Sequence, residues 1–335
     1  MAKKKMLKAA ILGFGGMGHC HASQYGAQKN VQLVAVCDID KSKFHLENVE
    51  LNFGDSGSSD VNSMNCYLSY EELIKGEPDL DYIDICLPSD LHCEYACRAM
   101  KDGFNVLCEK PMALNTKDCK KMIKTSYDTG KLLMIAQCLR FDESFNEITK
   151  AYKSGKYGKL LRFSLKRMGS FPGGWFRDVK RSGGALMDLH IHDCDFIMHL
   201  LGKPDAIRAN GVVVKSGGID DLSVDFVYND GPIVMGESSW ARPSWSCGMA
   251  AIFEEATIDV TGGKVMVYQM DKPVKEIKLP GKGNCYFHEI AYFADCVKKG
   301  VRPEIASIES TRDTITVLEQ EVKSAFAKGK LIKLK

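Results

Sequence analysis

The sequence lacks any apolar run of the roughly 18 residues that a membrane-spanning helix needs, so we expect no membrane span. It also lacks an excess of charge, because 45 Lys and Arg residues oppose 43 Asp and Glu residues. A dedicated nucleic-acid binder normally carries a strong basic excess. That function is therefore not expected, whereas small anionic and neutral ligands both stay open. Internal repeats are absent too, and the one segment of low complexity, FGDSGSSD at 53–60, predicts a mobile loop.

The cysteines lack a Cys-x-x-Cys pair, and their number, 13, is odd. Many lie inside apolar runs, such as Cys37, Cys86, Cys108 and Cys138. A buried thiol behaves as a small hydrophobic group, and a disulfide framework is not expected in a chain of this length. The pattern indicates reduced thiols in a cytoplasmic protein.

The N-terminal segment MAKKKMLKAAIL has two interpretations. Its basic start and apolar continuation are the order found in a signal peptide. However, the apolar run breaks at once into Gly13, Gly15, Gly16 and Gly18. A strand that enters a glycine turn explains both the run and the break, so we favour the strand.

Two domains of ordinary size fit a chain of 335 residues with 45% hydrophobic and 26% charged residues. Up to residue 138, short apolar runs alternate with amphipathic stretches such as 91–101 and 116–128. Such runs predict parallel strands that are buried on both faces of a doubly wound α/β sheet. The predicted strands are 8–12, 32–37, 82–87, 104–108 and 131–136.

The character of the sequence changes after about residue 140. A helical pattern covers about 183–200, and two more helices are predicted near 284–299 and 307–328. Between them lie strand-like runs separated by short turns, which favour an antiparallel sheet. These runs are 206–215, 221–228, 232–240, 248–254, 257–260 and 264–269. We therefore predict a first domain over 1–138 and a second, α+β domain over 139–335, with a large, mostly antiparallel open sheet.

A dinucleotide-binding pattern follows the first predicted strand. The segment LGFGGMG carries Gly13-x-Gly15-x-x-Gly18, and the next strand ends in Asp38, at the spacing expected for the acid that binds the adenosine ribose. The glycines allow a tight turn, a close backbone approach to the pyrophosphate and close helix packing, while the helix N-terminus attracts the phosphates. Asp38 would repel a 2′-phosphate, which favours NAD over NADP. The alternative is a plain glycine turn in which Asp38 caps a helix.

A lysine follows the fourth predicted strand, in the sequence Glu109-Lys110-Pro111. The carboxyl end of a parallel strand faces the crevice in which ligands bind. A lysine in this place is more often solvated, so a catalytic role stays one of two interpretations. The peptide bond before Pro111 is a candidate for the cis form.

The segment SGGALMDLHIHDCDF at 182–196 is the other concentration of chemistry. If 185–199 is an α-helix, Asp188 and His192 share a face, and Asp195 and His199 continue it. Three interpretations stay open at this point. His192 is a general base oriented by Asp188, or His190 and His192 bind a metal with carboxylates, or the histidines are buried and hydrogen-bonded. The metal is disfavoured, because residues two apart on a helix point away from each other.

Together and in order, these motifs resemble the Gfo/Idh/MocA family, typified by glucose–fructose oxidoreductase and inositol 2-dehydrogenase. The resemblance covers nearly the whole chain and rests on GFGGMG with Asp38, LPSDLH at 87–92, EKP at 109–111, LRF at 139–141, SGGALMDLHIHDCD at 182–195 and FHEIAYFADCVKKG at 287–300. It extends through the PEIASIESTRDTITVLEQ segment at the end of the chain. The family implies a Rossmann first domain and an NAD(H)-dependent enzyme, without a metal, that acts on a secondary hydroxyl of a sugar or polyol.

The resemblance also implies roles for individual residues. Lys110, Asp188 and His192 match the catalytic lysine, acid and histidine. The cofactor-binding positions are Gly13, Phe14, Gly15, Gly16, Met17, Gly18, Asp38, Ile39, Leu87, Pro88, His92, Glu109, Lys110 and Arg140. The substrate-binding positions are Lys110, Arg140, Trp175, Arg177, Asp188 and His192. Relatives pair through the second sheet, so a homodimer or homotetramer is expected.

In the implied reaction, His192 takes the hydroxyl proton as hydride leaves the substrate, Lys110 donates a hydrogen bond to the same oxygen, and Asp188 orients the imidazole. Two rival functions stay open: an NAD-dependent glycosidase that uses transient hydride abstraction, and a dinucleotide-binding regulator without activity. The chain departs from the family at Leu87 and Ser89, often Thr and Asn, and at His190, often a small residue. His190 either places a second imidazole near the pocket or packs beneath it.

Overall fold

The computed structural model describes residues 6–45, 50–51, 54–55 and 63–334. The chain divides into two compact units: residues 1–137 with 285–312, and residues 138–284 with 313–335. The predicted domains met at 138/139, whereas the first unit also includes the later segment 285–312. Apart from Gly54–Asp55, the predicted loop at 53–60 lies outside the described residues.

The first unit contains a sheet of six described strands, all parallel, in the order β5-β2-β1-β6-β7-β8. Its strands are β1 (Leu7–Leu12), β2 (Val31–Cys37), β5 (Asn65–Tyr67), β6 (Tyr82–Ile85), β7 (Asn105–Glu109) and β8 (Leu133–Ala136). Its helices are α1 (Gly16–Tyr25), α2 (Tyr70–Gly76), α3 (His92–Lys101), α4 (Thr116–Thr129) and α8 (Cys285–Lys299). Short elements complete it: η1 (Lys41–His45), η2 (Ser89–Leu91), and the small pair β3 (Glu50–Leu51) and β4 (Gly54–Asp55). This is the predicted doubly wound sheet.

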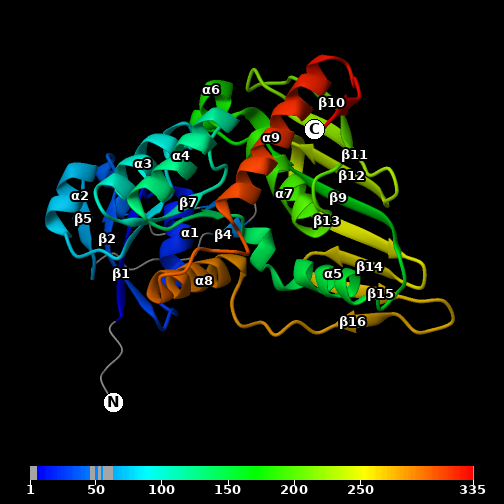
Figure 1. Ribbon diagram of the computed structural model, residues 1–335, viewed down its shortest axis with the longest axis horizontal. Coiled ribbons are helices and arrows are strands. Elements are labelled where there is room, and N and C mark those ends of the chain that lie inside the picture. The colour runs from blue at the N-terminus through cyan, green and yellow to red at the C-terminus, as the bar shows by residue number, and fades with distance from the viewer. Residues whose placement is uncertain (1–5, 46–49, 52–53, 56–62, 335) are drawn as a thin grey trace. The chain divides into compact units, whose positions relative to one another are not determined.

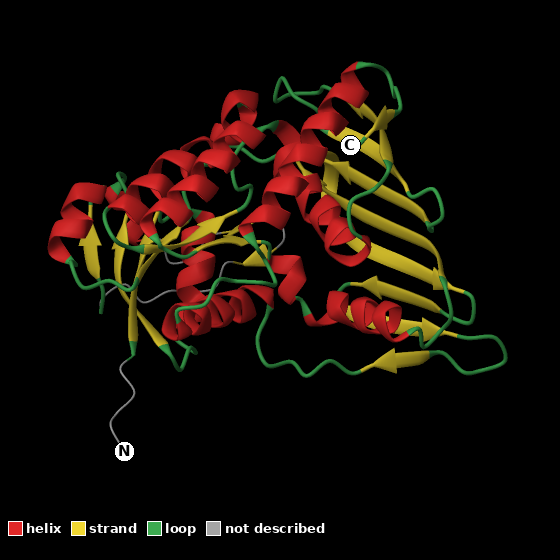
Figure 2. Cartoon of the chain, viewed as in Figure 1, coloured by secondary structure: helices red, strands yellow, loops and turns green. Residues whose placement is uncertain are grey.

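Strand order reverses at β1, which is the feature that positions a ligand site. From β1 the chain moves to β2 and β5 on one side, and later to β6, β7 and β8 on the other. Because βαβ connections are right-handed, this reversal puts α1 on one face and α3 with α4 on the opposite face, as the cartoon shows (Figure 2). The crevice at the carboxyl ends of β1 and β6 is the usual ligand site of such a sheet.

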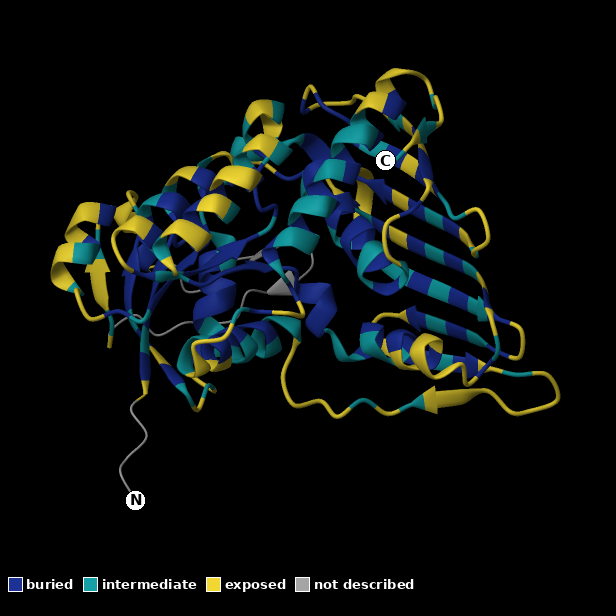
Figure 3. Cartoon of the chain, viewed as in Figure 1, coloured by how far each residue is buried: buried dark blue, intermediate teal, exposed yellow. Residues whose placement is uncertain are grey.

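Burial explains why these strands were recognisable. Every residue of β6 and β8 is buried (Figure 3); β8 is a continuous apolar run in sequence, whereas β6 carries the buried Asp84 between apolar residues. Helix α8 belongs to this core, because Ile290 and Phe293 are fully buried and the ring of Phe293 meets that of Tyr82 edge-on at 5.2 Å. Segment 285–312 therefore completes the first unit although it follows the second in sequence.

The second unit contains a sheet of nine described strands in the order β16-β15-β14-β13-β9-β12-β11-β10-β17, drawn in green and yellow in Figure 1 except the last strand. All neighbours are antiparallel except β9 and β12. Its strands are β9 (Leu160–Ser170), β10 (Ala206–Val212), β11 (Asp221–Val227), β12 (Ile233–Ser239), β13 (Ala241–Phe253), β14 (Thr257–Thr261), β15 (Lys264–Tyr268), β16 (Lys275–Ile277) and β17 (Ile332–Lys333). The predicted large, mostly antiparallel sheet is confirmed.

The second unit also contains helical elements, several of which contact this sheet. They are η3 (Cys138–Phe141), α5 (Glu143–Ser154), η4 (Gly174–Arg177), α6 (Val179–Ser182), η5 (Leu186–His190), α7 (Ile191–Leu201) and the later part of α9 (Ile308–Phe326). Along β9, residues on one side are buried while those on the other alternate with them as intermediate or exposed. One face of the sheet therefore forms the core of this unit.

The predicted helix over about 183–200 is present as one helical run over 184–201, but its first part is not regular. Residues Leu186–His190 form a π-helical turn within it, and α7 continues as a regular α-helix from Ile191. The π-helix bonds each carbonyl to the N–H five residues on and widens the turn, a feature often found at functional sites. The expectation that Asp188 and His192 share a face rests on α-helical spacing, and Asp188 lies within the π-helical turn.

All 13 cysteines lie in the described part of the chain and all are unbridged. Among the described residues, no helix combines the length and the apolar character that crossing a membrane requires.

Candidate active site

The glycine turn between β1 and α1 has the geometry that its sequence predicts. Gly13 adopts φ +95°, and a Cβ atom there would lie 2.7 Å from the carbonyl oxygen of Cys86. A Cβ atom at Gly18 would collide with the carbonyl oxygen of Gly13. A side chain at either position is therefore incompatible with the close packing of α1 on β1 and β6.

The N-terminus of α1 is open to a ligand. Gly15 caps the helix, and a Cβ atom on it would meet no atom within 4 Å. Gly15, Gly16 and Met17 are half-buried, and the first turn carries no acidic residue. Backbone N–H groups at such an end attract phosphate through direct bonds and the helix dipole. The residues present therefore fit a dinucleotide pyrophosphate.

Asp38 lies beside this turn and helps to fix it. Its Oδ2 accepts a hydrogen bond from the backbone N–H of Phe14 at 2.7 Å, and its Oδ1 accepts from that of Asp40 at 2.9 Å. Each carboxylate oxygen has two lone pairs, so both can still accept from ribose hydroxyls. The ring of Phe14 is fully buried, and only its backbone faces Asp38. Ile39 is 90% exposed next to the carboxylate.

The loop after β6 holds the half-buried Leu87 and Pro88. The imidazole of His92 connects this loop to the one after β7: its Nε2 lies 2.8 Å from the carbonyl oxygen of Leu87 and its Nδ1 lies 2.7 Å from that of Pro111. The ring is buried, and burial lowers the pKa of His92 below its ordinary value. Its contacts are those of a residue that fixes the two loops.

Lys110 stands at the carboxyl end of β7 and is half-buried. Its backbone N–H donates to Oε2 of Glu109 at 3.0 Å. The Oε1 of Glu109 lies 3.0 Å from Nε2 of His21, and Glu109 is buried. The Lys110–Pro111 bond is cis, as predicted. His21 was not among the predicted site residues, because its sequence position looks like the interior of a helix.

In the second unit, Asp188 and His192 occupy a distinctive pair of positions. Within the continuous described stretch 184–197, these two residues are half-buried and all the others are buried. The Nδ1 of His192 lies 3.8 Å from the thiol of Cys138. An acid and an imidazole are therefore the polar groups that this buried helical segment presents outward.

His190 packs beneath the surface on which Asp188 and His192 lie. Of the two interpretations left open for His190, the structure therefore supports packing beneath that surface. Its Nδ1 lies 3.1 Å from the hydroxyl of Ser238 on β12, and its Nε2 lies 3.4 Å from Oε2 of Glu321 on α9. The ring is fully buried. In the described part of the chain, two clusters of His, Cys and acidic residues are compact enough to hold a metal ion. Both clusters contain His21, and neither includes His190 or His192.

Arg140 is bound by a carboxylate of its own unit. Its Nε and Nη2 donate to the two oxygens of Asp195 at 2.7 and 2.6 Å, and the hydroxyl of Thr314 donates to Oδ1 of Asp195 at 2.9 Å. Both charged side chains are almost completely buried. These bonds join η3, α7 and α9, so Arg140 has a structural task besides the cofactor and substrate contacts predicted for it.

Trp175 and Arg177 lie in the short helix η4. The ring of Trp175 stacks on that of Phe176 at 3.9 Å, and Phe176 meets Trp240 edge-on at 6.1 Å. Trp175 is half-buried and Arg177 is exposed. An aromatic ring that is partly exposed offers a flat apolar surface to a ligand.

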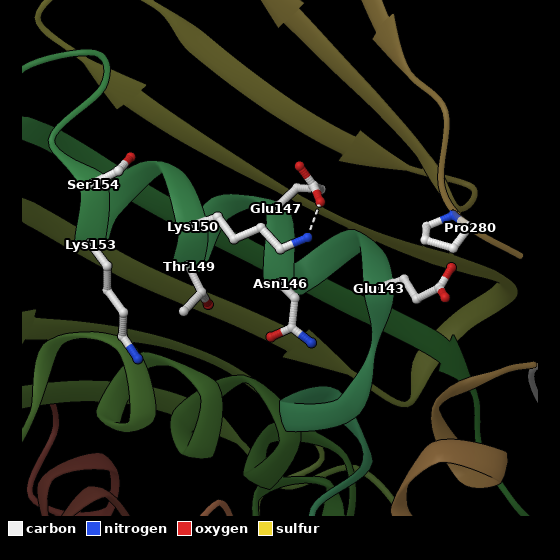
Figure 4. Close-up of a pocket in the computed structure, with 8 residues that line it drawn as sticks. All are labelled: Glu143, Asn146, Glu147, Thr149, Lys150, Lys153, Ser154 and Pro280. Atoms are coloured by element: carbon white, nitrogen blue, oxygen red, sulfur yellow. Dashed lines mark hydrogen bonds and ion pairs between the residues drawn. The ribbon is translucent and has the colours of Figure 1, made fainter. Parts of the chain in front are cut away.

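A separate hollow of about 760 Å³ lies beside α5 in the second unit (Figure 4). Its lining residues are Glu143, Asn146, Glu147, Thr149, Lys150, Lys153, Ser154 and Pro280. None of them is a predicted site residue, and Lys150 donates to Glu147 at 2.6 Å on the same helix. We assign no function to this hollow.

The two-domain fold and the glycine turn define a dinucleotide-binding protein. The chain belongs to the Gfo/Idh/MocA oxidoreductase family: the model of its NAD-binding Rossmann domain matches residues 7–137 and that of its C-terminal domain matches residues 145–266. The predicted family is confirmed.

Individual relatives cover nearly the whole chain. Inositol 2-dehydrogenase of Rhizobium meliloti (strain 1021) is 26% identical over 313 residues, which are 88% of this chain and 89% of the relative. The scyllo-inositol 2-dehydrogenase (NAD(+)) of Bacillus subtilis (strain 168) is 24% identical over 334 residues, or 91% and 90% of the two chains. Among solved structures, the aldose-aldose oxidoreductase from Caulobacter crescentus complexed with glycerol has a TM-score of 0.85 at 21% identity, over 98% of this chain and 100% of that one. This likeness shows the shared fold.

Proposed function

We propose that this oxidoreductase transfers hydride between a secondary hydroxyl of a sugar or polyol and the nicotinamide of NAD. The observation that carries the proposal is the outward position of Asp188 and His192 in an otherwise buried segment. The half-buried Lys110 at a strand end of the Rossmann sheet supports it. The inositol dehydrogenases to which the chain is similar support the substrate class.

Each side chain has a task in this reaction. His192 takes the hydroxyl proton, and Asp188 orients the imidazole and stabilises its positive charge. Lys110 donates a hydrogen bond to the same oxygen and stabilises the developing alkoxide. A positioned acid or base of this kind contributes about 10²–10⁴ in rate. Bound NAD supplies the hydride acceptor, and no metal has a task in this reaction.

The cofactor is proposed to be NAD in preference to NADP. The carboxylate of Asp38 is fixed next to the glycine turn by two backbone N–H groups. It suits the two hydroxyls of an unmodified ribose and repels a 2′-phosphate. The predicted contacts of Ile39, Leu87, Pro88, His92, Glu109 and Arg140 with cofactor belong to the same proposal.

Two broader features are proposed with it. The less buried face of the second sheet includes Leu161 and Ile233, which are 47% and 57% exposed. An apolar face of this kind is normally covered, and we propose that a second copy of the chain covers it in a homodimer or homotetramer. The 13 unbridged cysteines favour the reducing cytoplasm.

The test is reduction of NAD⁺ by the purified protein with a panel of inositols, aldoses and sugar acids, with NADP⁺ in parallel. Lys110→Ala is expected to lower kcat on the responding substrate by about 10²–10⁴. Lys117→Ala is the matched control, since Lys117 is an exposed lysine of the same unit, and it is expected to keep full activity. Turnover that survives in Lys110→Ala would remove the assigned role of the lysine.

A further inference from the structure

A buried histidine of the dinucleotide-binding helix contacts carboxylates from two strands of the first unit. His21 on α1 is fully buried. Its Nδ1 lies 2.9 Å from Oδ2 of Asp84 on β6, and its Nε2 lies 3.0 Å from Oε1 of Glu109 on β7. A third carboxylate, that of Glu289 on α8, lies 3.9 Å from Nε2. The ring therefore bridges the two strands next to the point where strand order reverses.

The hydrogen-bond partners and the charges around this ring together favour its doubly protonated form. Ionised carboxylates only accept hydrogen bonds, and an imidazole donates from both nitrogens only when it is doubly protonated. Burial by itself lowers the pKa of His21, but the charge and hydrogen bond of Asp84 outweigh it and raise the pKa well above its ordinary value. The polar groups that face the ring among the described residues are Asp84, Cys86, Glu109, Glu289, Tyr82 and, at 6.0 Å between centroids, Tyr286. None of these groups is a cation, so His21 is the positive charge of the cluster.

Distances favour a proton over a metal ion in this cluster. Contacts of 2.9 and 3.0 Å between ring nitrogens and carboxylate oxygens are ordinary lengths for charge-assisted N–H···O bonds. A tetrahedral zinc ion holds its nitrogen and oxygen ligands at about 2.0–2.2 Å each, which sets neighbouring ligands further apart than these pairs. Asp84 is also engaged elsewhere, because it accepts from the hydroxyl of Tyr25 at 2.8 Å.

The connection to the proposed chemistry runs through Glu109. One oxygen of this carboxylate accepts from His21, and the other accepts from the backbone N–H of Lys110 at 3.0 Å. On the other side of Lys110, the ring of His92 lies against the carbonyl oxygen of Pro111. Two buried rings therefore hold the turn that carries the lysine, one through the preceding residue and one through the following residue.

We propose that His21, as an imidazolium, is a positioning residue for Lys110: it fixes the Glu109 carboxylate, which in turn fixes the backbone from which the lysine side chain extends. This inference rests on the proposed dehydrogenase function, in which Lys110 contacts the reacting oxygen. It also links the glycine turn to the lysine, because α1 carries both the dinucleotide-binding N-terminus and His21. Partners that orient the ligands of a metal site are worth about 10–100-fold in activity, and we expect an effect of this order from a partner that fixes the backbone of Lys110.

A double-mutant cycle tests this role. His21→Gln is expected to lower kcat at saturating cofactor by about 10–100-fold in the wild-type chain and by less than about twofold in the Lys110→Ala chain, because the group that it positions is then missing. His19→Gln is the matched control: His19 is a buried histidine of the same helix whose Nε2 lies 3.0 Å from the carbonyl oxygen of Lys43. In the His19→Gln chain, Lys110→Ala should lower kcat by the same factor as it does in the wild-type chain. Equal losses from His21→Gln in both chains would overturn the proposal.

A spectroscopic measurement on the wild-type chain tests the protonation state of His21 directly. It requires neither a variant that folds nor enzymatic turnover. With ¹⁵N-labelled histidine, the His21 ring should give imidazolium signals from about pH 6 to pH 8, where an ordinary histidine titrates. Asp84→Asn, which keeps the ring and the shape of the cluster, should restore titration in this range. A neutral His21 ring in the wild type would overturn the proposal. Absence of any polyol-dependent NAD⁺ reduction, with imidazolium signals intact, would instead contradict the proposed function alone.

Discussion

Replacing Asp195 by Asn is expected to destabilise the second unit strongly. Asp195 accepts two hydrogen bonds from Arg140 and one from Thr314. The side chains of Arg140 and Asp195 are 2% and 1% exposed, so water does not screen the pair. Asn has one acceptor oxygen and no charge, so in the variant the buried guanidinium loses its counter-charge.

The magnitude follows from that geometry. Removing one partner of a buried ion pair costs about 3–5 kcal/mol, and with a urea m-value of about 2 kcal/mol/M the unfolding midpoint should fall by about 2 M. The chain has three tryptophans, Trp175, Trp240 and Trp245, and all belong to the second unit. Tryptophan fluorescence therefore reports the unfolding of this unit and not that of the first.

The matched control is Glu147→Gln. Glu147 pairs with Lys150 at 2.6 Å, but the lysine side chain is 69% exposed, and exposed pairs on a helix contribute about 0.3–0.5 kcal/mol. This variant should unfold close to the wild-type midpoint. If Asp195→Asn unfolds at the same urea concentration as Glu147→Gln, the argument from burial is wrong.

Two further predictions concern cofactor choice and pH. Asp38→Ser should raise the KM for NAD⁺ by about 10–100-fold, because charge-assisted hydrogen bonds are lost, and it should reduce the preference for NAD⁺ over NADP⁺. Asp40→Ser is the control. An unchanged preference for NAD⁺ in Asp38→Ser would contradict the role of the acid. Burial and the charge of Arg140 lower the pKa of His199 to about 4, so the folded chain binds this proton more weakly than the unfolded chain. His199 therefore has no effect on the free energy of unfolding above about pH 6.5. As the pH falls towards 4, it lowers that free energy by about 1–2 kcal/mol, after a discount for partial exposure. His199→Asn should remove this loss of stability, which is measured as the difference between the urea unfolding midpoints at about pH 6.5 and at about pH 4.

The sequence was sufficient for the fold class because the parallel strands are buried on both faces. A strand such as β8 is then a continuous apolar run, and the glycine turn adds a motif with fixed spacing. Strand β9 was missed, although it lies in the centre of the second sheet. Its buried residues alternate with Arg162, Ser164 and Lys166, but the exposed Leu161 and the buried Arg167 break the apolar–polar pattern in the sequence.

The sequence predicts a candidate site residue where the position along the chain alone points to it, and it gives no sign of a residue whose partners are distant in sequence. Lys110 follows from its place at a strand end. His21 had no local signal, because Asp84, Glu109 and Glu289 lie 63, 88 and 268 residues further along the chain. The π-helix at Leu186–His190 was unpredictable for another reason: the choice between hydrogen-bond registers depends on packing, and the apolar pattern is compatible with both.

The most direct test of the central claim is to follow the hydrogen atom. The protein would be incubated with NAD⁺ and polyols that carry deuterium on their carbinol carbons, and the nicotinamide product would be isolated and examined by mass spectrometry. The proposed reaction predicts that deuterated NADH accumulates in step with the keto product, and that Lys110→Ala forms far less of it. Product formation without accumulated NADH would contradict the claim in favour of a transient hydride mechanism, and cofactor binding without any transfer would contradict it in favour of a regulator.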